Sequence, residues 1–136
     1  MAYLLDTSII IAILKGNAKV KNKLVKCILS GEKICINAIS YYEIKRGALS
    51  SVNSIKELEK FEKFIKEFSV DVVLLDNLNI FDKASEIYAE LRNKGKLISD
   101  ADILIASIAI FHNFTLVSDD TDFNRISGLK IENWLL

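Results

Sequence analysis

Short apolar runs alternate along the chain with longer stretches in which apolar residues recur every three or four positions. The longer stretches have the spacing of amphipathic helices. The short runs predict strands at residues 3–5, 33–36, 70–75, 114–117 and 130–131. Strands that alternate with helices favour a parallel sheet, because each helix carries the chain back to the start of the next strand. The pattern predicts a three-layer α/β fold, with a mostly parallel sheet of four or five strands flanked by helices.

Polar residues and glycines predict where the helices start and stop. The expected helices cover residues 9–14, 18–29, 38–50, 54 to about 68, 79–93, a stretch from 100 onward and a short turn at 122–126. Asn37 and Ser99 are expected to cap helix N-termini, and Ser54 with Glu57 three residues later matches a capping box. Gly95 is expected just beyond the end of helix 79–93.

The two helices within residues 38–68 are joined by a short polar turn and are expected to form a hairpin. The second helix carries a wide apolar stripe among charged residues, made of Leu58, Phe61, Phe64, Ile65 and Phe68. A stripe of this kind usually packs into the core of its own domain. Its aromatic area is also large enough for an interface. The sequence leaves both interpretations open, and a homodimer or partner contact is expected on this hairpin.

The composition is that of a single globular domain, residues 1–136. Hydrophobic residues make up 51% of the chain, which indicates extensive burial. No apolar run reaches the roughly 18 residues of a membrane helix, so no membrane contact is expected. The N-terminus lacks the pattern of a secretory signal, which predicts a cytoplasmic protein. Cys27 and Cys35 lack the spacing of a metal site and are expected to be buried thiols.

The charges balance overall but are unevenly distributed. With 18 basic and 18 acidic residues, no net field draws the protein to nucleic acid. An early basic stretch holds Lys15, Lys19, Lys21, Lys23 and Lys26, and the C-terminal part holds Asp100, Asp102, Asp119, Asp120 and Asp122. The single histidine, His112, is expected at a helix end, which argues against a Ser/His/Asp site. The acids are therefore the main candidates for chemistry.

Asp6 follows the first predicted strand and precedes a helix, with Thr7 and Ser8 directly after it. One interpretation is that this trio only caps the helix. The other is that Asp6 is a functional ligand, because α/β folds bind ligands at the carboxyl ends of their strands.

Three further positions carry acids that require an explanation. Asp102 lies in the most apolar helix, where an ionised carboxylate is costly unless it is paired or binds a cation. Glu43 lies in the middle of a helix beside apolar neighbours. The loop of residues 118–123 holds three acids within four positions, and it converges with Asp6 if the two preceding strands are neighbours. A ligand set made only of oxygen suits Mg²⁺ or Mn²⁺.

These motifs resemble, from end to end, those of the PIN-domain ribonucleases, and most closely the VapC-type toxins of toxin–antitoxin pairs. Residues 3–8 resemble the opening hydrophobic-Asp-Thr/Ser motif of the family, and residues 42–47 its E-x-x-x-G helix. Residues 100–106 are similar to its D-x-x-I-A helix, and residues 116–123 to its closing acidic loop. Ser118 stands where that loop commonly has Thr.

The resemblance implies Mg²⁺-dependent endonucleolytic cleavage of RNA, with Mn²⁺ as a possible substitute, and inhibition by a cognate antitoxin protein. The catalytic and metal-binding acids that it implies are Asp6, Glu43, Asp102 and Asp120. Asp122 is a second candidate for the fourth position, because the loop is shorter than in many relatives. The candidates for substrate contacts are Thr7, Ser8 and Arg46.

Two other functions match parts of the sequence. A PIN-like module that binds RNA or protein without cutting has the same fold but needs none of the acids. A phosphoacceptor domain would use Asp76 after the third strand, but such domains have paired acids after the first strand, where Asp6 stands alone. The complete set of acids favours the nuclease.

Overall fold

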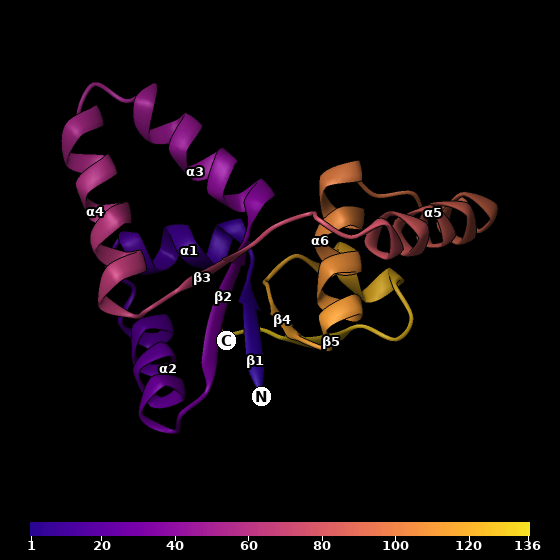
Figure 1. The fold of residues 1–136 in the computed structure, drawn as a ribbon, viewed down its shortest axis with the longest axis horizontal. Coiled ribbons are helices and arrows are strands. Elements are labelled where there is room, and N and C mark those ends of the chain that lie inside the picture. The colour runs from indigo at the N-terminus through magenta and orange to yellow at the C-terminus, as the bar shows by residue number, and fades with distance from the viewer.

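The computed structural model describes residues 1–136 throughout and has three layers (Figure 1). Its five-stranded sheet has the order β3-β2-β1-β4-β5, and all neighbouring strands are parallel. The strands are β1 (Ala2–Leu5), β2 (Lys33–Asn37), β3 (Asp71–Val73), β4 (Thr115–Val117) and β5 (Lys130–Glu132). The predicted α/β class is confirmed, and the sheet is parallel throughout.

Helices cover both faces of the sheet (Figure 1). One face carries α1 (Thr7–Leu14), α2 (Ala18–Leu29), α3 (Ala38–Leu49) and α4 (Ser54–Glu67), and the other carries α5 (Leu78–Asn93) and α6 (Asp100–His112). A short 3-10 helix, η1 (Thr121–Arg125), follows β4. Successive side chains of a strand point to opposite faces, so Leu4 packs in the core under α5 and α6, and Leu5 packs in the core under α1 and α4.

Most predicted helix ends agree with the structure. The side chains of Asn37 and Ser99 accept hydrogen bonds at the N-termini of α3 and α6, and Gly95 follows α5 with a φ of +65°. The capping box predicted at Ser54 is wrong, because α4 begins at Ser54 itself and has no side-chain cap. The polar turn before α4 is held instead by the Ser51 hydroxyl, which accepts the Asn53 N–H at 3.1 Å.

The third strand is shorter than predicted. The sequence predicts a strand over residues 70–75, but only Asp71–Val73 pair. The strand ends at Val73 because its one neighbour, β2, ends opposite it at Asn37, where α3 begins. Both cysteines are free thiols, and burial raises the pKa of Cys35 to about 11. None of the helices has the length and apolar character needed to cross a bilayer.

The apolar stripe of α4 belongs to the core. Phe61 is 0% exposed and Phe64 3%, and both pack with residues of α1 and β2. The core interpretation is therefore confirmed for these two rings, and the expectation that they form a partner surface is wrong. Three exposed aliphatic residues of the hairpin lie around its turn instead: Leu49 is 65% exposed, Val52 99% and Ile55 74%.

Candidate active site

Asp6 lies where β1 gives way to α1, beside the end of β4. The register pairs Leu5 with Val117, and the Asp6 N–H donates to the Val117 carbonyl at 2.9 Å. The Ser118 hydroxyl and the Thr7 N–H each donate to one oxygen of the Asp6 carboxylate, both at 2.8 Å. Asp6 is thus the N-cap residue of α1 and a member of the strand-end site, so its two interpretations are compatible.

Three more acids meet beside it. Carboxylate oxygens of Asp102, Asp120 and Asp122 lie within 4.8 Å of one another. Asp102 is in the first turn of α6, and its N–H donates to the Ser99 hydroxyl at 3.2 Å. Asp120 caps η1 by accepting the Asp122 N–H at 2.9 Å. We call Asp6, Glu43, Asp102, Asp120 and Asp122 the acid cluster.

Burial and mutual repulsion act on the central acids. Burial raises the pKa of the Asp6 carboxyl, and the charges of Asp102 and Asp120 raise it further, against the hydrogen bonds from Ser118 and Thr7. Burial also raises the pKa of Asp102, with added repulsion from Asp120, Asp122 and Glu43. The predicted acids therefore lie within electrostatic range of one another. A bound cation would remove this repulsion.

The two candidates in the last loop are both part of this group, but they differ in their neighbours. The Asp120 charge acts on both Asp6 and Asp102, whereas the Asp122 charge acts on Asp102. Asp122 also pairs with Arg125 at 3.3 Å. Asp120 thus interacts with two of the other acids, and its choice over Asp122 as the fourth acid stays a prediction.

Glu43 is tied to the cluster through hydroxyl groups. The Thr7 hydroxyl lies 2.9 Å from a Glu43 carboxylate oxygen and 2.9 Å from the Ser40 hydroxyl. The side-chain amide of Asn37 donates to the Ser40 hydroxyl at 3.1 Å. A hydroxyl has one proton and an ionised carboxylate only accepts, so the bonds run in one direction: Asn37 donates to Ser40, Ser40 to Thr7, and Thr7 to Glu43.

Two partners in this arrangement were not assigned a site role from the sequence. Ser40 is 0% exposed and Ser118 2%. Ser118 bonds directly to Asp6, and Ser40 bonds to Thr7, which in turn bonds to Glu43. The signal for Ser40 is its place three residues after the Asn37 cap and three before Glu43, which puts it on the same helix face as Glu43. The signal for Ser118 is its place directly after a strand that neighbours the strand before Asp6.

The other two predicted substrate residues, Ser8 and Arg46, make no hydrogen bond or ion pair with an acid of the cluster. The Ser8 hydroxyl donates to Asp119 at 2.8 Å on the exposed side of the loop. The Arg46 guanidinium lies 5.1 Å from the centre of the Tyr42 ring, and no ion pair joins it to an acid. Thr7 is the candidate with a direct contact to a cluster acid.

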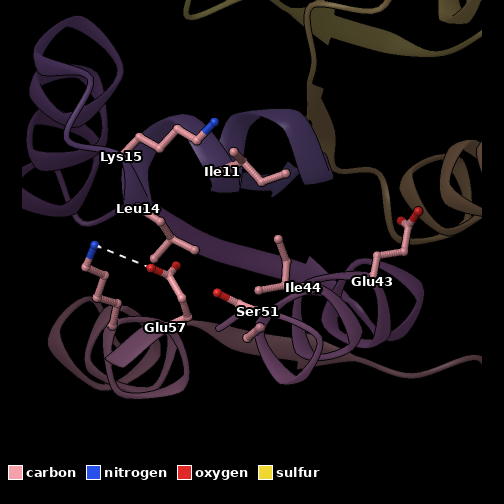
Figure 2. A pocket seen from close by; sticks show the side chains of 10 residues that line it. Ile11, Leu14, Lys15, Glu43, Ile44, Ser51 and Glu57 are labelled. Carbon is pink, nitrogen blue, oxygen red and sulfur yellow. Dashed lines mark ion pairs between the residues drawn. The ribbon is translucent and has the colours of Figure 1, made fainter. Parts of the chain in front are cut away.

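A groove of about 380 Å³ leads away from Glu43 between α1, α3 and α4. Figure 2 shows Glu43 at one end of it and Lys15 and Glu57 toward the other. Its apolar lining comes from Ile11, Leu14, Ile44 and Ala48. Lys60 also lines it and lies 3.8 Å from Glu57. The groove thus joins an apolar surface to the acid cluster.

The chemistry of the cluster fits a hard divalent cation. Its donors are carboxylates supported by hydroxyl groups, with no histidine or thiol among them. Oxygen ligands of this kind suit Mg²⁺ or Mn²⁺ and do not favour zinc or copper. The N-termini of α1 and α6 carry Asp6 and Asp102 and therefore lie at the acid cluster. Helix N-termini favour anionic groups such as phosphate.

Comparison with known proteins identifies a family that matches nearly the whole chain. Residues 3–129 match the model of the PIN domain family. The chain is 28% identical over 135 residues to "Ribonuclease VapC1" of Haemophilus influenzae, covering 98% of both sequences. It is 29% identical over 136 residues to "tRNA(fMet)-specific endonuclease VapC" of Shigella flexneri, again covering 98% of both.

Solved structures show the same fold. The chain resembles a chain in the crystal structure of VapBC2 from Rickettsia felis, bound to a DNA fragment from its promoter. The TM-score is 0.91 at 30% identity, covering 98% of this chain and 99% of that one. For DNA-bound VapBC from Salmonella typhimurium the TM-score is 0.88 at 26% identity, covering 98% of both chains.

Proposed function

The chain belongs to the PIN domain family, and on that premise we propose that it is a metal-dependent endoribonuclease, the toxin of a toxin–antitoxin pair. The observation that carries the proposal is the acid cluster: the carboxylate oxygens of Asp102, Asp120 and Asp122 lie within 4.8 Å of one another, and Asp6 and Glu43 are close enough for their charges to interact with this group. The curated relatives are named as a ribonuclease and a tRNA-specific endonuclease, and each aligns with 98% of the chain. A non-catalytic binding module does not need such a cluster, whose repulsion is a cost to the fold.

The metal ligands in this proposal are Asp6, Asp102 and Asp120, with Glu43 and Asp122 binding directly or through water. The cation is Mg²⁺, and Mn²⁺ is expected to substitute because it accepts the same oxygen ligands. When bound, such an ion stabilises charge on the scissile phosphate and lowers the pKa of water.

The chain's own groups bind and orient the reactants. The N-termini of α1 and α6 attract the phosphate. Thr7 donates to Glu43 and so fixes one carboxylate oxygen, which leaves the other to accept a hydrogen bond from the attacking water. Asp120 has a fixed orientation of its own, because its N–H donates to Ser118 at 3.0 Å and its carboxylate caps η1.

The antitoxin is proposed to bind along the groove beside Glu43. An apolar lining that ends at a group of acids suits an amphipathic peptide with a cationic side chain at one end. Such a peptide would block the cluster. The similar structures are of VapBC complexes, which supports a protein partner.

A homodimer is also proposed, with the turn of the α3–α4 hairpin as its contact. Leu49, Val52 and Ile55 expose their side chains there without cover. A patch of exposed apolar residues often marks a surface that binds another protein.

The proposal is tested by incubating the purified protein with total bacterial RNA and Mg²⁺ or Mn²⁺. Asp6→Asn and Asp102→Asn are expected to lower the cleavage rate by more than about 100-fold, since even residues that only support metal ligands typically contribute 10- to 100-fold. Asp82→Asn is the matched control, because it removes an exposed acid of α5 outside the cluster. Cleavage that persists in EDTA, or in Asp102→Asn, would contradict the proposal.

A further inference from the structure

The α1–α2 segment concentrates positive charge that the acid cluster does not use. Between Thr7 and Gly31 the sequence has five lysines and no acid: Lys15, Lys19, Lys21, Lys23 and Lys26. All of them are exposed, and none takes part in an ion pair. On a protein with no net charge, such a segment makes a local positive field that attracts polyanions.

One of these lysines meets two others in a hollow between α2 and α4. Lys21 lines this hollow of about 160 Å³ together with Lys60 and Lys63. Residues 60 and 63 project from the same side of α4 because they are three positions apart. Glu67 also lines the hollow, and Glu57 offsets part of the Lys60 charge at 3.8 Å. The three ammonium groups still outnumber the acids around them.

The hollow adjoins the groove that ends at Glu43. Leu14 and Lys60 line both. We call groove and hollow together the trough, which has Glu43 of the acid cluster at one end and Lys21, Lys60 and Lys63 at the other. In Figure 2 Glu43 lies at one end of the groove, and Leu14 lies toward the other with Lys15 and Glu57. α1 runs beside the trough, and its eight residues span about 12 Å at 1.5 Å per residue. At about 3.4 Å per nucleotide of a stacked strand, this is a span of about three to four nucleotides.

We propose that the RNA backbone lies along this trough, with the scissile phosphate at the acid cluster and a phosphate a few nucleotides away bound by Lys21, Lys60 and Lys63. The inference rests on the proposed nuclease function and adds a second contact for the same substrate. It assigns no base recognition, because lysine contacts to phosphate position a strand without reading its sequence. It also means that RNA and the antitoxin compete for the groove part of the trough.

The test compares Lys21→Gln/Lys63→Gln with the wild-type protein on a labelled RNA of 20 nucleotides around a cleavage site mapped in total bacterial RNA. Both residues are exposed helix positions, and Gln has a similar helix propensity, so the variant should fold. We expect apparent KM to rise about fivefold or more with kcat within about twofold of wild type, and the slope of log KM against log salt to fall by about 0.7 per lysine. Fluorescence anisotropy in EDTA should show the same weakening of RNA binding without cleavage.

Two controls show whether the effect comes from the trough lysines and from the length of the RNA. Lys56→Gln/Lys96→Gln removes the same charge from exposed lysines that do not line the trough and is expected to leave KM unchanged. A trinucleotide around the same site is too short to reach the hollow, so wild type and variant should cut it equally. Equal KM values on the long RNA for all three proteins would overturn the inference, as would a variant that loses only antitoxin binding. A wild-type protein that cuts no RNA would overturn the proposed function, and the inference with it.

Discussion

The hydroxyl of Thr7 and the carboxylate of Glu43 lie 2.9 Å apart, although 36 residues separate them in the sequence. Thr7 opens α1 at the end of β1, and Glu43 lies on α3 after the neighbouring strand β2. The bond therefore links the first two strand ends of the sheet at the acid cluster. Ser40 and Asn37 are both 0% exposed. Ser40 bonds to the Thr7 hydroxyl, and Asn37 bonds to Ser40. Buried partners of this kind keep a catalytic side chain in one orientation.

Replacing Thr7 by Val is expected to lower the rate of RNA cleavage by about 10- to 100-fold, the usual effect of losing a supporting residue. Val keeps the shape of Thr but has no hydroxyl to donate to Glu43. Thr7→Ser keeps the hydroxyl and should retain most of the activity. Steady-state cleavage measures both. If Thr7→Val cuts RNA as fast as wild type, the Thr7–Glu43 bond has no part in orienting Glu43.

Ser40→Ala is expected to lower the free energy of unfolding by about 1–3 kcal/mol, because the Asn37 amide then loses its buried acceptor. Ser107→Ala is the matched control: Ser107 is also a helical serine with 0% exposure, but its hydroxyl donates to the Ile103 carbonyl of its own helix. That carbonyl keeps its helical partner when the hydroxyl is removed, so the loss should be much smaller. Urea denaturation gives both values. Equal losses for the two serines would mean that the Asn37–Ser40 bond adds nothing.

Most of the fold could be predicted because each helix or strand depends mainly on residues that are close together in the sequence. The apolar runs and helix caps placed nearly all elements, and the alternation of strands with helices implied a parallel sheet. The predictions failed where the structure depends on contacts between distant parts of the chain. β3 ends at Val73 because its neighbour β2 ends opposite it at Asn37, where α3 begins. The Phe61 and Phe64 rings are buried because α1 lies over α4, and no local pattern states which helix covers which.

The acids of the site could be predicted because carboxylates in apolar or repulsive settings are unusual in a sequence. Their supporting groups could not. Nothing in the sequence distinguishes Ser40 and Ser118 from other serines. They reach the site because β1 lies between β2 and β4 in the sheet. The choice between Asp120 and Asp122 also depended on the structure, since the tight turn of η1 brings both close to Asp102.

Asp6→Asn is expected to raise the free energy of unfolding of the metal-free protein by about 1 kcal/mol at pH 7, a common result of removing a functional residue that costs stability. Burial and neighbouring acids raise the pKa of Asp6 in the folded state, so the folded protein holds this proton more tightly than the unfolded chain does. The stability of the metal-free wild type should therefore fall as pH rises from the unfolded pKa through the raised folded pKa.

Urea denaturation in EDTA at a series of pH values measures this effect. The decline with pH should be smaller in Asp6→Asn, because one of the acids responsible is gone. Asp82→Asn, which removes an exposed acid of α5, should follow the wild-type curve. A less stable Asp6→Asn protein in EDTA would mean that the hydrogen bonds of Asp6 outweigh its burial and repulsion.

Adding Mn²⁺ or Mg²⁺ is expected to raise the melting temperature of the wild-type protein. A ligand that binds only the folded state stabilises it by about 2.7 kcal/mol at a concentration 100 times its Kd. Asp102→Asn should reduce this shift strongly, because Asp102 is the acid on which Asp120, Asp122 and Glu43 all act. Differential scanning fluorimetry with each ion gives the shifts, and Lys96→Gln, on an exposed side chain outside the cluster, serves as control. A shift of equal size in Asp102→Asn would place the bound ion elsewhere.

Val52→Lys/Ile55→Lys is expected to separate the proposed homodimer into folded monomers. Both side chains are largely exposed at the turn of the hairpin, so charged replacements cost little in a monomer but must be buried in a dimer that uses this surface. Phe61→Ser is the contrasting variant. Phe61 is 0% exposed, and truncating a buried Phe typically costs about 3–5 kcal/mol, so this change tests the core and should lower the melting temperature in either case. Light scattering after size-exclusion chromatography, with circular dichroism to monitor folding, distinguishes the two effects. A dimer that survives both lysines would show that the copies associate through another surface.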